Sequence, residues 1–178
     1  MCIRDSLKSV LEELNRAGTE GELEEIRREL QEGGYLRPDT DRKRMKQAKL
    51  PPMRFESTDG YPIYVGRNNR QNDELTFRLA RKDDIWCHAS KVHGSHVIIS
   101  CGGTTPPDDT VTQAAQLAAY YAETGGGQNI PVDVTAVKQV KKIPNGKPGM
   151  VIYHTYRTVI ANPYPDIVVD ALNAETKE

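Results

Sequence analysis

The feature that most constrains the fold is an alanine-rich stretch at residues 109–123. Apolar residues recur there at helical spacing, and most of them are small. This spacing predicts a helix with one face of small and apolar residues, made of Val111, Ala114, Ala115, Leu117, Ala118, Ala119 and Ala122. Small side chains let a helix approach a flat neighbour closely, so we expect this helix to pack on a β-sheet.

Short segments rich in β-branched and aromatic residues supply the strands of that sheet. Thr58-Asp59-Gly60 separates the first two as a hairpin turn. The expected strands are residues 53–57, 62–66, 84–90, 95–101, 130–140 and 149–161, with a short helix at 70–80. Strands grouped in hairpins, instead of alternating strictly with helices, favour an α+β fold with a mainly antiparallel sheet.

Residues 7–32 have a different pattern, in which leucines, isoleucine and valine recur at spacings of three and four among many charges. This predicts two amphipathic helical stretches, interrupted at residues 17–19 and ended at Gly33-Gly34. An apolar stripe this short has little to bury itself against, so we expect it to pack on a helical partner or to belong to a longer coiled coil. We therefore expect a helical or coiled-coil remnant at 1–34, a basic linker at 35–52, a domain at 53–165 and an acidic tail at 166–178, with residues 1–6 outside any pattern.

Composition limits the function classes. The 24 Lys+Arg and 25 Asp+Glu give a net charge of -1, so only local charge can favour a nucleic-acid partner. The 3 cysteines show no C-x-x-C spacing, which gives neither a disulfide framework nor a zinc finger and fits a reducing compartment. No apolar run reaches the roughly 18 residues of a membrane span. We expect a cytoplasmic protein that has no membrane partner.

The first polar cluster is VGRNNRQND at residues 65–73, a turn that enters the short helix. Asn72 or Asp73 can cap that helix, and the whole cluster is then explained by turn chemistry. Alternatively, Arg67 and the helix N-terminus can hold a phosphate or a ribose, because both present hydrogen-bond donors.

The second cluster, residues 83–96, contains the only Trp and three of the four His. On a strand, Asp84, Trp86 and His88 share one face, while Cys87 points to the other. That row is either covered by helices or open to a ligand that stacks a base on Trp86. The spacing of His and Cys is not that of zinc ligands, and Gly94-Ser95-His96 is not a nucleophile elbow, so we expect no metal, no other cofactor, no catalytic residue and no enzymatic activity.

The third cluster is a basic stretch at residues 138–149. It contains Lys138, Lys141, Lys142 and Lys147 at a strand end and in the following turn. These lysines either protect a sheet edge from pairing with other chains or contact phosphates.

These motifs, at the separations found here, resemble the C-terminal RNA-binding domain of the NFACT family, which includes a bacterial ribosome quality-control factor also called fibronectin- or fibrinogen-binding protein. The resemblance covers residues 53–162 and rests on VGRNNRQND, DIWCH, GSHVII and the KK-x-P-x-G-KPG pattern. Where the family has an aliphatic residue in DIW-x-H, this chain has Cys87, a position that we expect to face the core.

The resemblance implies a module that binds tRNA or ribosomal RNA and acts on stalled large ribosomal subunits. Since the family's N-terminal tRNA-binding domain has no counterpart here, we expect a fragment of a longer protein, with a stand-alone module as the alternative. The RNA-binding residues implied are Arg67, Asn68, Asn72, Asp73, Asp84, Trp86, His88, Ser95 and His96, together with the four lysines. A second hypothesis is a protein-interaction module, with residues 7–32 docking a partner and the domain recognising a ribosomal or host matrix protein.

Overall fold

The computed structural model describes residues 10–11, 13–15, 17–37 and 50–164. The chain divides into two compact units at the junction of Pro51 and Pro52. Most of the expected basic linker and the whole acidic tail lie outside the described residues, as do residues 1–6. In the part of the chain that is described, no helix is both long and apolar enough to cross a membrane.

The first unit is built around helix α2 (Glu20–Glu32). Thr19 begins it with a reciprocal cap: its side chain accepts a hydrogen bond from Glu22 N at 3.3 Å, and the Glu22 carboxylate accepts one from Thr19 N at 3.2 Å. This is the Thr-x-x-Glu capping box, which satisfies two backbone donors that a helix leaves unpaired. Residues 10–11 and 13–15 are also helical, so the predicted interruption at residues 17–19 is confirmed.

The second unit is a six-stranded antiparallel sheet, which confirms the α+β prediction. Its strands lie in the order β1-β2-β4-β3-β5-β8. Their bounds are β1 Met53–Glu56, β2 Pro62–Val65, β3 Ile85–Ala89, β4 Val97–Ile99, β5 Ile130–Ala136 and β8 Arg157–Ala161. The predicted turn between β1 and β2 is confirmed by their antiparallel pairing and by Gly60, which takes the positive φ of 80° that glycine tolerates best.

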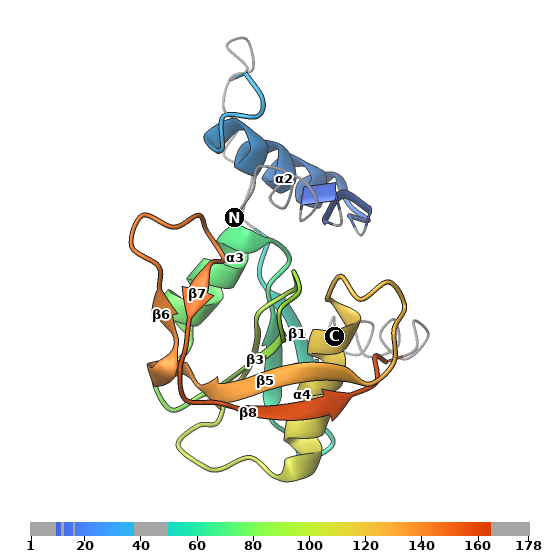
Figure 1. Ribbon diagram of the computed structural model, residues 1–178, viewed down its shortest axis with the longest axis vertical. Coiled ribbons are helices and arrows are strands. Elements are labelled where there is room, and N and C mark those ends of the chain that lie inside the picture. The colour runs from blue at the N-terminus through green and yellow to red at the C-terminus, as the bar shows by residue number, and fades with distance from the viewer. Residues whose placement is uncertain (1–9, 12, 16, 38–49, 165–178) are drawn as a thin grey trace. The chain divides into compact units, whose positions relative to one another are not determined.

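Helix α4 (Asp108–Tyr120) covers one face of this sheet (Figure 1). Ala114, Ala115, Ala118 and Ala119 are fully buried against it, as the small-residue face predicts. The strands contribute alternate residues to the same core, among them Ile63, Val65, Cys87, Val97, Ile99, Val132 and Val134. Cys87 therefore faces the core, as expected from the strand alternation.

A second, smaller layer covers part of the opposite face. It consists of helix α3 (Asn69–Glu74), the π-helical turn η1 (Leu75–Leu79) and a short ribbon of β6 (Lys141–Lys142) and β7 (Val151–Ile152) (Figure 1). The core of this layer contains Leu75, Trp86, Ile98, Val137 and Val140. The middle of the sheet is consequently buried on both sides, which explains why DIWCH and HVII have few exposed positions.

Two elements differ from the sequence prediction. The helix expected at residues 70–80 widens after Glu74, where Ala80 N bonds to Leu75 O at 2.9 Å, so that Leu75 is buried but Leu79 is 58% exposed. The strands expected at 130–140 and 149–161 are each interrupted. Strand β5 stops at Ala136, and the 3-10 turn η2 (Val137–Gln139) directs Val137 and Val140 into the second core.

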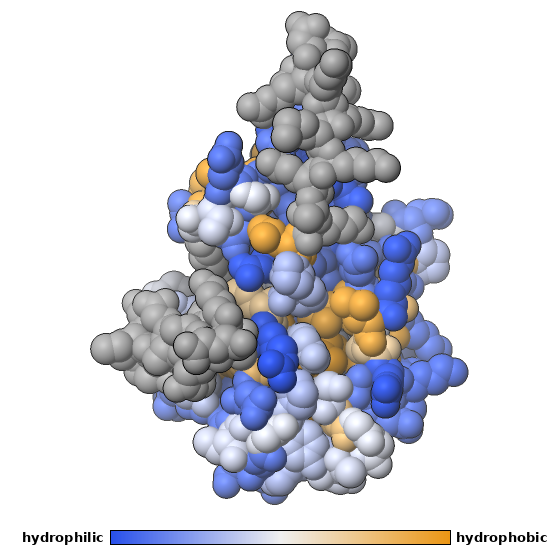
Figure 2. Space-filling view, turned by 180° about the vertical axis from the view of Figure 1, so that it is seen from behind, coloured by the Kyte–Doolittle hydropathy of each residue, from blue (hydrophilic) through white to orange (hydrophobic). Residues whose placement is uncertain are grey.

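The surface seen from behind is mainly hydrophilic, with one larger group of hydrophobic residues and smaller separate ones (Figure 2). Among the described residues of the second unit, the large hydrophobic side chains that stay exposed are Phe77, Leu79, Ile152, Tyr156 and Ile160.

Candidate nucleic-acid interface

Among the described residues, one basic stretch lies on residues 141–152, which we call the basic hairpin. Lys141, Lys142 and Lys147 are all exposed on it. Lys142 forms an ion pair with Asp73, whereas Lys141 makes no ion pair with any residue that the structure describes. Lys138 precedes the hairpin and pairs with Asp83 at 3.3 Å. Because Lys141 and Lys142 are consecutive on a strand, their side chains point to opposite sides, so Lys141 is turned away from the Asp73 contact.

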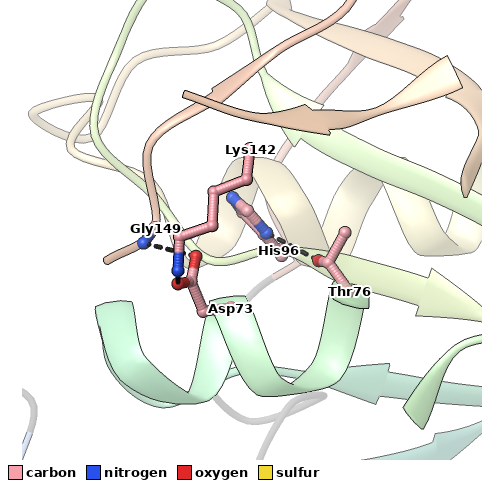
Figure 3. A network of polar contacts seen from close by, with 5 residues as sticks. All are labelled: Asp73, Thr76, His96, Lys142 and Gly149. Atoms are coloured by element: carbon pink, nitrogen blue, oxygen red, sulfur yellow. Dashed lines mark hydrogen bonds and ion pairs between the residues drawn. The ribbon is translucent and has the colours of Figure 1, made fainter. Parts of the chain in front are cut away.

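Asp73 fastens the basic hairpin to helix α3. One carboxylate oxygen pairs with Lys142 Nζ, and the other accepts a hydrogen bond from Gly149 N at 2.8 Å (Figure 3). Gly149 has a φ of 80°, and a Cβ there would lie 2.6 Å from Asn69 Oδ1. Only glycine fits this conformation and this close approach, so the glycine of the KPG motif is what lets the hairpin dock on α3.

The first cluster shapes the start of α3. Asn68, not Asn72 or Asp73, is the N-cap: its side chain accepts a hydrogen bond from Gln71 N at 2.9 Å. The prediction of Asn72 or Asp73 as the N-cap was therefore wrong. The helix begins four or five positions earlier, and both residues lie inside it. Gln71 in turn accepts a hydrogen bond from Arg67 N at 2.8 Å, which fixes the turn. The Arg67 side chain is partly buried.

Asn72 connects this helix to the segment that leads into β4, where His96 lies. Its Oδ1 accepts a hydrogen bond from His96 N at 3.0 Å, and its Nδ2 donates to Gly94 O at 3.4 Å. His96 Nδ1 lies 2.8 Å from Thr76 Oγ1 on η1 (Figure 3). Both Asn72 and His96 are buried, so they hold the second layer together instead of forming an open binding surface.

The structure decides between the two alternatives for Trp86, a covered face or one open to a ligand. The indole is fully buried, so it is not open to stack a base. It lies parallel to His88 with ring centroids 5.5 Å apart, edge-on to His96 at 5.3 Å, and against Tyr153 at 4.8 Å. The strand alternation placed Trp86 and His88 on one face correctly, but the second layer covers that face.

Burial in this aromatic cluster lowers the pKa of both histidines. The pKa of His96 falls to about 3 because the buried ring is poorly solvated, and the nearby His88 adds to the effect. The pKa of His88 falls to about 4, again mainly through burial. Both imidazoles are thus neutral near pH 7, and neither supplies positive charge to a phosphate.

The other two predicted site residues also have structural partners. Asp84 is buried and accepts hydrogen bonds from Arg81 N at 2.7 Å and Cys101 N at 2.8 Å, which closes the turn before β3. Ser95 is buried too, and its backbone N donates to Tyr121 O at 3.2 Å, linking the segment before β4 to the end of α4.

Sequence reasoning missed a polar group on β5. Asp133 is buried, and its carboxylate accepts hydrogen bonds from Tyr153 and Thr158, both at 2.8 Å. Burial and this contact raise the pKa of Tyr153. The sequence did contain a sign of this group, because Asp133 is the single acid in the apolar run IPVDVTAV. An acid on a buried strand must find hydrogen-bond donors for its carboxylate.

The described residues offer hydrogen-bond donors for an anion. Among them, no three His, Cys, Asp or Glu side chains are placed to hold a metal ion. Burial raises the pKa of the Cys87 thiol to about 12, so it is not a thiolate nucleophile at neutral pH.

Comparisons with known proteins identify the family to which the chain belongs. Residues 52–155 match the family model described as the NFACT protein RNA binding domain. The chain is 44% identical over 151 residues to the Rqc2 homolog RqcH of Bacillus subtilis, covering 83% of this chain and 26% of that protein. The corresponding protein of Streptococcus pneumoniae serotype 2 is 44% identical over 158 residues, covering 88% of this chain and 28% of the relative.

A solved structure is similar over nearly the whole chain. It is the C-terminal part of the fibronectin/fibrinogen-binding protein from Streptococcus suis, with a TM-score of 0.84 and 39% identity, covering 94% of this chain and 66% of that one. The chain spans only about a quarter of the length of the RqcH relatives.

Proposed function

Because the chain belongs to the NFACT RNA-binding domain family, we propose that its basic hairpin binds the phosphates of an RNA. The observation that carries this proposal is the position of Lys141, which is exposed and makes no ion pair among the described residues, on a hairpin fastened through Asp73. A cation in this position meets a phosphate without first giving up a protein partner.

The site residues then divide into two groups. Lys138, Lys141, Lys142 and Lys147 face solvent and contact the RNA backbone, with Arg67 beside the start of α3 as a further donor. Buried or partly buried side chains hold the loops and the hairpin in place, and their contribution to RNA binding is positioning. They are Asn68, Asn72, Asp73, Asp84, Trp86, His88, Ser95 and His96.

We further propose that the RNA is a tRNA or ribosomal RNA on a stalled large ribosomal subunit in the cytoplasm. The similarity to proteins named Rqc2 homolog RqcH supports this, as does the small share of those proteins that the chain covers, which is what a piece of a longer ribosome-associated factor would give. The module binds and positions RNA, and any activity of the longer protein depends on its other parts.

A titration of labelled tRNA at rising salt tests the proposal. Each phosphate that the protein neutralises releases condensed counterions, so the affinity of the native chain should fall linearly in a plot of log affinity against log salt. Reversing the charge of Lys141 and Lys142 together should weaken binding and make that slope shallower by roughly one for each phosphate that the variant no longer neutralises. Arg54→Glu, which changes an exposed residue of the edge strand β1, is the matched control. Binding that ignores salt, or that the hairpin variant leaves unchanged, contradicts the proposal.

A second candidate function is a protein-interaction module. It is favoured by the helical first unit, where Leu11, Leu14 and Leu23 are 56%, 40% and 45% exposed and would suit a helical partner. Cosedimentation with large ribosomal subunits separates the two candidates: deleting residues 1–34 should leave RNA-dependent binding intact, whereas binding through a helical partner should disappear.

A further inference from the structure

We propose that an unstacked RNA base stacks on Tyr156 beside an apolar pocket at the end of strand β5 and the start of strand β8. This inference rests on the RNA-binding function proposed above and adds a base-contacting site to its phosphate contacts. It moves the stacking platform from the buried Trp86 to a tyrosine that solvent can reach.

Tyr156 is the exposed end of a column of aromatic rings. The column starts at Trp86, which is fully buried, and continues through Tyr153, whose ring centroid is 4.8 Å from that of Trp86. Tyr156 packs edge-on against Tyr153 at 5.2 Å and is itself 51% exposed. Tyr153 is also held by its hydrogen bond to Asp133, so the last ring rests on a fixed support. A rigid, half-exposed ring of this kind loses little conformational freedom when a base stacks on it.

Tyr156 also lines a pocket of about 290 Å³. The pocket reaches down to Val111 of α4 and Val134 of β5, both of which are buried, while Tyr156 and Arg157 form its solvent-exposed side. This volume is at the lower end of the range for small-molecule sites, which suits one planar group better than a larger ligand.

The positive charge of Arg157 at the pocket suits a phosphate attached to that planar group. Arg157 forms an ion pair with Asp108 at 3.4 Å, but both side chains are largely exposed, at 58% and 92%. Exposed ion pairs contribute little stability, so the guanidinium can exchange Asp108 for a phosphate at small cost. An apolar pocket, an aromatic ring and an exchangeable cation together match a nucleotide, with its base on Tyr156 and its phosphate on Arg157.

The position of Tyr156 connects this pocket to the basic hairpin. Strand β7 ends at Ile152, and residues 153–156 lead directly from it to Arg157, the first residue of β8. A single-stranded segment whose backbone follows the lysines can therefore continue toward Tyr156. Since the pocket admits one base, the site should require unpaired nucleotides.

The experiment compares two probes on the full chain: a single-stranded RNA oligonucleotide, and inorganic polyphosphate, which carries the charge without bases. Tyr156→Ala should weaken RNA binding roughly 5- to 150-fold, the range for loss of one stacked base. It should leave the salt slope and the affinity for polyphosphate unchanged. Tyr156→Phe keeps the ring and should bind like the native chain, and Phe77→Ala, which removes another partly exposed ring on η1, is the matched control.

Each outcome has a distinct meaning. Equal RNA affinity for the native chain and Tyr156→Ala overturns the stacking site, and so does a loss that also appears with polyphosphate. If Tyr156→Ala lowers the unfolding temperature, Arg157→Gln provides the second variant, and it should weaken RNA binding and make the salt slope shallower. A native chain that binds neither probe overturns the proposed function itself, and this inference with it.

Discussion

His96 is a side chain whose ionisation depends strongly on the fold. It is 1% exposed and contacts Thr76, Trp86, His88 and the backbone of Gly149. Burial lowers its pKa from 6.5 to about 3. In the unfolded chain the ring takes up a proton near pH 6.5, so between these values the unfolded state binds more protons than the folded state, and stability must fall as the pH falls.

We therefore expect the free energy of unfolding to decrease by about 2 kcal/mol through His96 alone between about pH 7 and pH 5. Urea unfolding at the two pH values measures the difference. His96→Gln should reduce this pH dependence without abolishing it, because the lowered pKa of His88 acts in the same direction. The exposed His154 provides a control through His154→Gln. The same pH dependence in native protein and His96→Gln would show that the imidazole is not the group responsible.

Individual residues also show what the sequence could predict about the site. Alternation along the strand placed Trp86 and His88 on one face and Cys87 on the core face, and the structure has them so. Alternation cannot tell whether a second layer covers a face, because that depends on residues more than 50 positions further along the chain, such as Val140 and Tyr153. Tyr156 escaped notice for the same reason, since its role depends on the ring beneath it.

At the scale of elements, the basic hairpin depends on a single carboxylate for its attachment to α3. Asp73 is only 13% exposed and serves both Lys142 Nζ and Gly149 N. Hydrogen bonds to charged groups contribute about 1.5–3 kcal/mol each, whereas a half-exposed ion pair contributes less.

We expect Asp73→Ala to open the hairpin without unfolding the sheet. Amide hydrogen exchange over residues 141–152 should accelerate by roughly ten- to a hundredfold, while β3 and β5 keep their protection. Lys142→Met removes the ion pair but leaves the Gly149 bond, so its effect should be smaller. Unchanged exchange in Asp73→Ala would mean that the hairpin is held by its apolar contacts instead.

The elements that could be predicted well are those whose structure is determined by residues close together in the sequence. The capping box begins α2, the Asp-Gly turn joins β1 to β2, and the alanine face packs α4 on the sheet. The interruption after Ala136 was not predictable from local pattern, because β-branched residues continue through Val137 and Val140. Tertiary packing ends the strand there: Val137 N bonds to Asp84 O at 2.9 Å, and both valines enter the second core.

For the whole molecule, the change of sequence pattern at Met53 lies next to two independent boundaries. The compact units meet at Pro51 and Pro52, and the family match begins at residue 52. The near-zero net charge hides this organisation, because an acidic helix in the first unit offsets the lysines of the basic hairpin. Local distribution of charge, and not its total, therefore carries the functional information.

We propose that RNA contacts the surface from the basic hairpin to Tyr156, while the buried polar residues only hold that surface in place. Mapping amide chemical shifts of the isotopically labelled chain during titration with single-stranded RNA tests this most directly. We predict that the largest changes fall on residues 138–157, with smaller ones near Arg67. Changes concentrated on β1 (Met53–Glu56) or on α2, with the hairpin unaffected, would contradict the account.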